Sequence, residues 1–236
     1  MLANVFALSL VVSGVQSFDA DDIVQKTFKD ATFTAKLIQS NQTELKKINR
    51  DFAASYRFGT TTAWIKEPNL LKLKSTVDDT DVVYLLDGAK RTYSVPRIKL
   101  SKSEDLSKSP GKRQTPLDFG FLTPSLFKNL FVATFVRVDR ESGDLVFDLT
   151  FEKKFDDSSR QRVFVDKDKR YVTKRMWFNQ EGRQLATFLY SKPKQEDGVW
   201  LPTYCVVKNV DDKVAGVTEY QSMRINSGLA DSLFRL

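Results

Sequence analysis

The chain has no histidine, and cysteine occurs once among its 236 residues. The absence of histidine excludes Ser-His-Asp and Cys-His catalysis and histidine-ligated metal sites. A single cysteine likewise excludes thiolate zinc sites, iron–sulfur clusters and an intramolecular disulfide. The ten glycines lie nine or more residues apart, so the chain lacks a glycine-rich loop that could hold a phosphate. We therefore expect no catalytic residue, no metal and no cofactor, and a binding protein rather than an enzyme.

Phenylalanine, by contrast, is abundant. Its 18 copies outnumber the 7 tyrosines and 3 tryptophans together. Phenylalanine offers apolar area without a polar group, so it suits surfaces that stay dry. The excess fits either the lining of an apolar cavity or a phenylalanine-rich core.

The chain carries a formal net charge of +7. Lysine and arginine are scattered along it, and no sequence signature of a nucleic-acid-binding domain is present. We therefore expect no nucleic acid partner. The positive charge fits either transient contact with an anionic membrane surface or a surface that only keeps the protein in solution.

Residues 1–17 have the pattern of a secretory signal peptide. Leu2 to Val12 form a short apolar run, and small residues precede the expected cleavage point at Ser17. The run is too short to span a bilayer, which takes about 20 apolar residues, although no lysine or arginine precedes it. A buried N-terminal helix or strand is the alternative. We expect residues 18–236 to form a single domain.

Most of the chain alternates polar and apolar residues with the period of two that indicates β-strands. Examples are the runs from Phe33 to Leu37 and from Leu145 to Phe151, which are separated from their neighbours by Asp-Gly, Ser-Gly, Glu-Gly and Pro-Asn turns. About ten or eleven strands without a βαβ rhythm predict an antiparallel meander. Residues 19–30 are the exception, with the spacing of a short amphipathic helix capped by an aspartate.

A second exception lies in the middle of the chain. Residues 101–115 are almost entirely polar and read as a loop. Thr123-Pro124 then marks a helix start, and apolar residues recur at helical spacing through residues 126–131. We interpret residues 116–131 either as a flap over a sheet or as a helix that plugs one end of a barrel.

Residues 196–207 raise a related question, because both faces of a strand in this stretch would be apolar. Protein, a partner or a ligand could cover the second face. Cys205 lies in this stretch among apolar neighbours, so we expect a buried, unreactive thiol.

Two short motifs follow one another along the chain, residues 63–71 (AWIKEPNLL) and residues 82–96. In this order and spacing they resemble a strand and turn, and the next hairpin, of the LolA/LolB-type carriers of outer-membrane lipoproteins. The C-terminal half is similar to relatives known as lipoprotein-sorting proteins. The matching stretches there are Gly182-Arg183, Tyr190-Ser191, residues 197–202 and residues 229–234.

The resemblance implies a mainly β fold with a few helices: a strongly curved, open antiparallel half-barrel with a helical lid. Acyl chains of lipids or lipoproteins would lie in an apolar cavity between sheet and lid. The carrier would work in the periplasm, with an inner-membrane transporter as a candidate partner. The residues expected to contact the ligand are Ala63, Ile65, Glu67, Leu71, Phe119, Phe121, Leu122, Leu126 and Phe127.

Glu67 departs from the family pattern. The family has an arginine before this proline, and that arginine holds the lid shut by donating hydrogen bonds to it. Glu67 shares a face with Ala63 and Ile65, but an ionised glutamate has no proton to donate. Either the lid closes differently, or the cargo differs, or Glu67 is only a solvated turn residue.

Three functions are compatible with these features. The first is a periplasmic carrier of lipid or lipoprotein. The second is an envelope interaction or sensor module of the same fold that binds a membrane protein. The third, a hydrolase of unusual type, is disfavoured by the absence of histidine.

Overall fold

The computed structural model describes residues 17–77 and 79–236, so the expected signal peptide lies, except for Ser17, outside the described residues. The strands are β1 (Asp30–Ser40), β2 (Thr60–Lys66), β3 (Leu70–Val77), β4 (Thr80–Asp87), β5 (Lys90–Val95), β6 (Leu100–Asp105), β7 (Phe131–Val138), β8 (Leu145–Phe151), β9 (Arg160–Val165), β10 (Val172–Phe178), β11 (Gln184–Ser191), β12 (Lys194–Glu196), β13 (Val199–Leu201), β14 (Tyr204–Asn209) and β15 (Val214–Ile225).

The helices are short. The α-helices are α1 (Gln42–Ile48), α2 (Arg50–Ser55) and α3 (Leu126–Asn129), and the 3₁₀ turns are η1 (Ala20–Asp22), η2 (Pro96–Ile98), η3 (Pro110–Lys112), η4 (Pro116–Phe119), η5 (Lys153–Phe155) and η6 (Asp231–Phe234). Within the described part of the chain, none of these helices has the length and apolar character needed to cross a bilayer.

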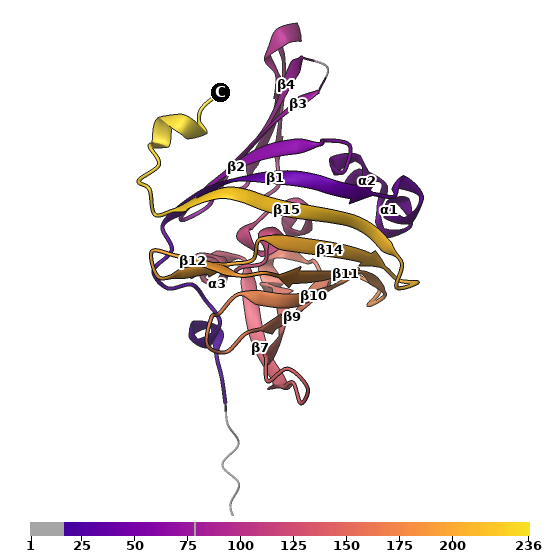
Figure 1. Cartoon of the computed structure of the whole chain (residues 1–236), viewed down its shortest axis with the longest axis vertical. Coiled ribbons are helices and arrows are strands. Elements are labelled where there is room, and N and C mark those ends of the chain that lie inside the picture. Colours follow the sequence, from indigo (N-terminus) through magenta and orange to yellow (C-terminus); the bar gives the residue numbers. More distant parts are fainter. Residues whose placement is uncertain (1–16, 78) are drawn as a thin grey trace, which may run out of the picture.

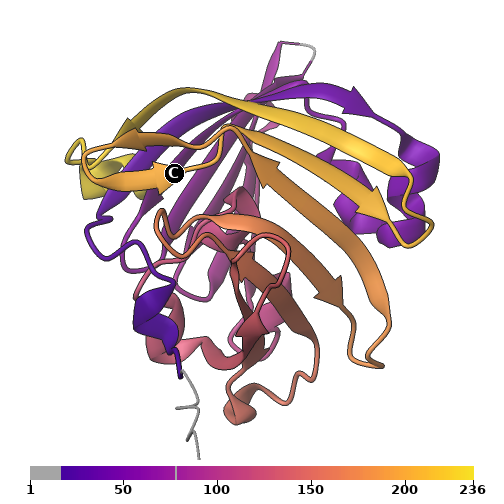
Figure 2. The ribbon, with the colours of Figure 1, turned by 60° about the horizontal axis from the view of Figure 1, so that its bottom comes forward.

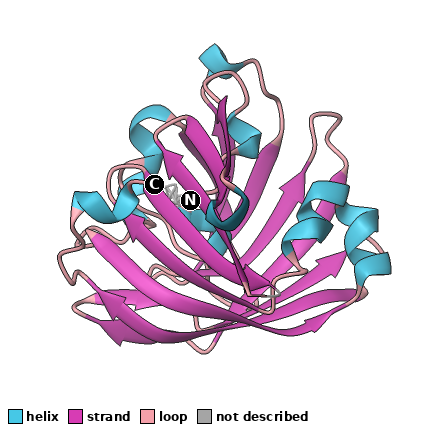
Figure 3. Ribbon diagram, turned by 90° about the horizontal axis from the view of Figure 1, so that it is seen from above, coloured by secondary structure: helices cyan, strands magenta, loops and turns pink. Residues whose placement is uncertain are grey.

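Among the described residues, thirteen strands form one antiparallel sheet in the order β6-β5-β4-β3-β2-β1-β15-β14-β11-β10-β9-β8-β7. The chain's first and last strands pair in its middle, whereas β6 and β7 are its edges. The sheet curves strongly without closing (Figures 1 and 2). Seen from above, it forms an open trough with short helices at its rim and inside it (Figure 3). The expected mainly β half-barrel is therefore confirmed.

Irregular register accompanies the curvature. The pairing of β1 with β15 shifts between Thr32 and Thr34 and again between Leu37 and Gln39. The pairing of β10 with β9 shifts between Val172 and Lys174. Bulges of this kind bend a strand and increase its twist, which suits a sheet that must wrap around a core.

Two expected helices are much shorter than the sequence pattern indicated. In residues 19–30, Asp19 does cap a turn, but only η1 forms, and Asp30 already begins β1. The backbone N–H of Gln25 donates to the carbonyl of Leu122 instead of continuing a helix. The second is α3, which ends at Asn129 because Phe131 pairs with Phe151 in the sheet.

Three further expectations were wrong. The residues read as a polar loop contain the edge strand β6, whose mostly exposed polar side chains gave no apolar signal. Helices α1 and α2 were missed, although Asn41 and Asn49 cap them. Helix α1 packs beside β14 and β15, and α2 packs against α1 (Figure 1). The strands also outnumber the ten or eleven expected, because several are too short to show a recognisable alternation.

Residues 196–207 do not form one strand. Val199–Leu201 belong to the separate β12–β13 hairpin, and Tyr204–Asn209 form β14 in the main sheet. Pro202, which has no N–H to donate, lies at the break. Cys205 is buried in β14 with its side chain 3% exposed, as expected.

Candidate functional site

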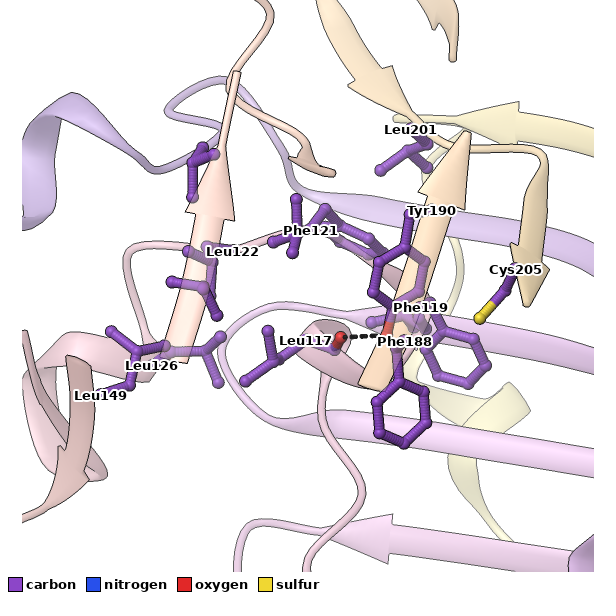
Figure 4. Close-up of a cluster of buried hydrophobic side chains, with 14 of the residues drawn as sticks. Leu117, Phe119, Phe121, Leu122, Leu126, Leu149, Phe188, Tyr190, Leu201 and Cys205 are labelled. Carbon is purple, nitrogen blue, oxygen red and sulfur yellow. Dashed lines mark hydrogen bonds between the residues drawn. The ribbon is translucent and has the colours of Figure 1, made fainter. Parts of the chain in front are cut away.

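One segment packs on the concave side of the sheet through most of its apolar side chains: residues 116–130, which we call the lid segment. It begins with η4, pairs Phe121 with Tyr171 through an isolated bridge, and ends with α3. Six of its apolar residues are 8% exposed or less: Leu117, Phe119, Phe121, Leu122, Leu126 and Leu130. The lid segment therefore contributes much of the interior of the trough, as Figure 4 shows for Leu117, Phe119 and Phe121 near Tyr190 and for Leu126 near Leu149.

The structure brings the expected contact residues together. Ala63 and Ile65 of β2 and Leu71 of β3 are buried in the same hydrophobic cluster as the lid side chains. The lid members of that set are Phe119, Phe121, Leu122 and Leu126, and Phe127 is partly buried against the cluster. Glu67 lies half-buried at its edge.

Little free space remains between sheet and lid. A cavity of about 50 Å³ is lined by Ile65, Glu67 and Leu71 from the sheet side and by Ser125 and Leu126 from the lid. Pockets that hold organic ligands usually enclose about 300–1,000 Å³. In this conformation the lid segment itself takes the place that an acyl chain would need.

Glu67 holds one end of the lid segment. Its carboxylate accepts a hydrogen bond from the Ser125 hydroxyl at 2.7 Å and another from the Ser125 backbone N–H at 3.2 Å. Ser125 is 6% exposed, so these bonds are shielded from water. Glu67 therefore contacts the lid as a hydrogen-bond acceptor rather than as a donor, and it is not a solvated turn residue.

Arg175 of β10 holds the other end. Its guanidinium donates to Asp118 of the lid segment at 2.7 Å and stacks on Phe188, with Cζ 3.8 Å from the ring centroid. The Tyr190 hydroxyl donates to the backbone carbonyls of Leu117 and Asp118 at 3.2 and 3.3 Å. The dashed line in Figure 4 marks the bond to Leu117. Polar groups thus fasten an otherwise apolar segment at both ends.

The groups around Arg175 are neutral apart from Asp118. Burial raises the pKa of Tyr190 and Tyr220 well above the ordinary value and the pKa of Cys205 to about 12. Burial opposes the charged form of Arg175, but the oxygens of Tyr190 and Asp118 raise its pKa above the ordinary value. The guanidinium therefore stays charged in a water-excluded site, and Asp118 supplies its counter-charge.

Sequence reasoning missed both Arg175 and Asp118. In β10, Val172, Arg175 and Phe178 are buried, whereas Met176 is only half-buried, so burial along this strand does not follow a strict period of two. The register shift after Val172 turns Arg175 toward the concave face, opposite the buried Val163 and Phe188. A bulge depends on pairing with other strands, so β10 by itself carried no signal for it.

No metal centre is assembled from the described residues, since no three histidine, cysteine, aspartate or glutamate side chains are grouped there as ligands. The candidate site is thus an apolar trough covered by the lid segment, which polar contacts hold at Ser125 and at Asp118, the partner of the buried Arg175.

Solved structures of similar fold include the following three. An outer-membrane lipoprotein-sorting protein domain from Vibrio parahaemolyticus is 14% identical with a TM-score of 0.53, covering 88% of this chain and 89% of that one. A DUF1329 family protein from Desulfovibrio piger is 12% identical with a TM-score of 0.52, covering 89% and 90%. A LolA superfamily protein from Nitrosomonas europaea is 15% identical with a TM-score of 0.56, covering 92% and 94%.

Residues 133–236 match a family model described as "Uncharacterized protein". A comparison with curated proteins gives no match. The similarity to the three solved structures extends over nearly the whole of each chain. This chain therefore has the LolA-like fold, and the resemblance noted in its sequence motifs is confirmed at the level of the fold.

Proposed function

We propose that this protein binds the acyl chains of a lipid or lipoprotein on the concave face of its sheet and carries them through the periplasm. The observation that carries the proposal is the lid segment. Its buried side chains are apolar, yet polar contacts fasten it at Ser125 and Asp118. A segment attached in this way can leave as a unit and expose an apolar trough.

The energetics favour reversible exchange. Burying an apolar side chain contributes about 1.5–3 kcal/mol, so the six buried lid side chains contribute roughly 9–18 kcal/mol. An acyl chain of about 16 carbons contributes roughly 13 kcal/mol at about 0.8 kcal/mol per CH₂. The acyl chain and the lid side chains would therefore compete for the trough with similar free energies of burial. This allows uptake and release without an energy source or a catalytic residue.

A lipoprotein-sorting role is supported by the shared fold of the Vibrio parahaemolyticus and Nitrosomonas europaea structures. The proposed partners are lipid or lipoprotein, an inner-membrane transporter that delivers it, and transient contact with an anionic membrane surface. Location in the periplasm follows from the proposal and is tested by fractionating cells that express the tagged full-length chain.

Binding is tested with N-phenyl-1-naphthylamine, a neutral probe that fluoresces in apolar sites. We expect the purified protein to bind the probe at micromolar concentration and a dipalmitoylated lipopeptide to displace it. Glu67→Ala should bind more tightly, since it removes the carboxylate that holds Ser125.

Glu181→Ala is the matched control, because Glu181 lies exposed in a turn away from the lid. It should behave like the wild type. Absence of probe binding to both the wild type and Glu67→Ala at micromolar concentrations would overturn the proposal.

A further inference from the structure

Arg175 is an unusual residue for the interior of a trough that receives apolar chains. Arg175 is buried, and burying an unpaired charge in such a site is costly. Its counter-charge comes from Asp118, which belongs to the lid segment and not to the sheet. When the lid leaves, the guanidinium stays on β10 and loses this partner.

The pairing with Asp118 does not use the full capacity of the guanidinium. Arg175 donates to Asp118 through one terminal nitrogen, and among the described residues its buried Nε–H has no hydrogen-bond partner. Guanidinium groups bind carboxylates and phosphates best through two parallel hydrogen bonds. An incoming anion could therefore be held by more bonds than Asp118 makes.

Asp118 also has a second task, because its other carboxylate oxygen accepts the backbone N–H of Thr115 at 2.8 Å. Its side chain is 30% exposed, whereas that of Arg175 is 6% exposed. The acid is thus the more solvated member of the pair and the one that can move into water with the lid. The Tyr190 hydroxyl, released from the lid carbonyls at the same time, would add a donor beside Arg175.

We propose that Arg175 and Tyr190 form a binding site for the anionic headgroup, carboxylate or phosphate, of an amphiphile whose chain lies in the trough, and that the lid segment imitates this ligand. In the closed state Asp118 stands in for the headgroup and the neighbouring Phe119, Phe121 and Leu122 stand in for the chain. The inference rests on the proposed function and adds the class of headgroup to it.

The test compares ligands with the same oleyl chain and different heads: oleate, 1-oleoyl-lysophosphatidate and neutral oleyl alcohol, each titrated below its aggregation concentration. We expect the wild type to bind at least one anionic ligand about tenfold or more tightly than the alcohol, the size expected for a charge-assisted hydrogen bond. A preference between oleate and lysophosphatidate identifies the headgroup as carboxylate or phosphate.

Two variants that both lack the competing acid form the decisive pair. Asp118→Asn can still accept the Thr115 N–H but frees Arg175, so it should bind the anionic ligand about tenfold more tightly than the wild type. The double variant Asp118→Asn with Arg175→Met buries no unpaired charge, which keeps it foldable, and thermal unfolding confirms its integrity. It should bind the anionic ligand and the alcohol about equally.

This inference would be overturned if the ratio of the affinity for the anionic ligand to the affinity for the alcohol were the same in both variants. Binding of the alcohol by the wild type without any preference for an anionic head would also overturn it, while leaving the proposed function standing. Failure of all three ligands with every variant would overturn both.

Discussion

The attachment of the lid segment at Ser125 can be tested by Glu67→Ala. This substitution removes both carboxylate oxygens that the Ser125 hydroxyl and backbone N–H use, at 2.7 and 3.2 Å. It leaves the apolar packing of Leu126 and the contacts of Arg175 in place. The lid should therefore open more often while the sheet keeps its stability.

The size of the effect follows from the geometry. A hydrogen bond to a charged group contributes about 1.5–3 kcal/mol. The second bond is long and Glu67 is half-buried, so about 2–3 kcal/mol for both is the fitting sum. At about 1.4 kcal/mol per factor of ten, lid opening should become about 30- to 150-fold more frequent.

Native-state hydrogen exchange measures this opening directly. The amides of residues 120–128 should exchange faster by this factor in Glu67→Ala, whereas those of β8 should not change. Glu67→Gln should lie between the wild type and Glu67→Ala, since a neutral amide oxygen can still accept the Ser125 hydroxyl proton.

The reasoning would be refuted if the lid amides exchanged at the wild-type rate in Glu67→Ala. It would also be refuted if β8 accelerated equally, because the carboxylate would then support the whole fold rather than the lid.

Three further predictions follow from individual contacts. Cys205 should react with a thiol reagent at pH 8 only on opening or unfolding, because burial raises its pKa to about 12 and keeps the thiol neutral. Gly120→Ala should loosen the lid by about 1–3 kcal/mol and speed that reaction, because its Cβ would lie 2.6 Å from the Tyr190 ring at a φ of +85°. Asp148→Asn should destabilise the protein at pH 7 by about 1–2 kcal/mol in urea unfolding, because it weakens hydrogen bonds from Arg162 at 2.8 Å.

The penalty of Asp148→Asn should shrink in acid. Burial alone would raise the pKa of Asp148, but Arg162 and Arg160 hold it below the ordinary value. The stabilisation is therefore present above the unfolded-state pKa of about 3.9 and is lost as the pH falls through the lower folded-state pKa. An equal penalty at pH 7 and pH 2 would contradict this assignment.

The glycine and cysteine predictions share a control. Gly143 has a φ of +76° but open space where a Cβ would lie, so Gly143→Ala tests backbone strain without a clash. It should leave the labelling of Cys205 unchanged. Faster labelling in Gly143→Ala than in Gly120→Ala would contradict the role of the contact with Tyr190, and rapid labelling of the native wild type would contradict the burial argument.

Local pattern was enough to identify much of the architecture. The alternation of residues 145–151 indicated a strand directly. Steric freedom at glycine likewise explains the positive φ at the expected turns, which contain Gly88, Gly143, Gly182 and Gly198. The placement of Glu67 on the face of Ala63 and Ile65 is likewise a property of a period-two strand. The helical spacing of apolar residues led to the interpretation of residues 116–131 as either a flap over the sheet or a plug at one end of a barrel.

The composition and the periodicity of this chain thus predicted by themselves that the protein is mainly β, lacks histidine chemistry and has an apolar segment that packs on a sheet. Only the tertiary structure decided what that segment contacts. Its Ser125 donates to Glu67, and its Asp118 accepts from Arg175, which a bulge turns inward. It also decided that α3 stops where Phe131 enters the sheet. The physical reason is common to these cases, because strand register is set by hydrogen bonds between residues distant in sequence, which no local pattern encodes.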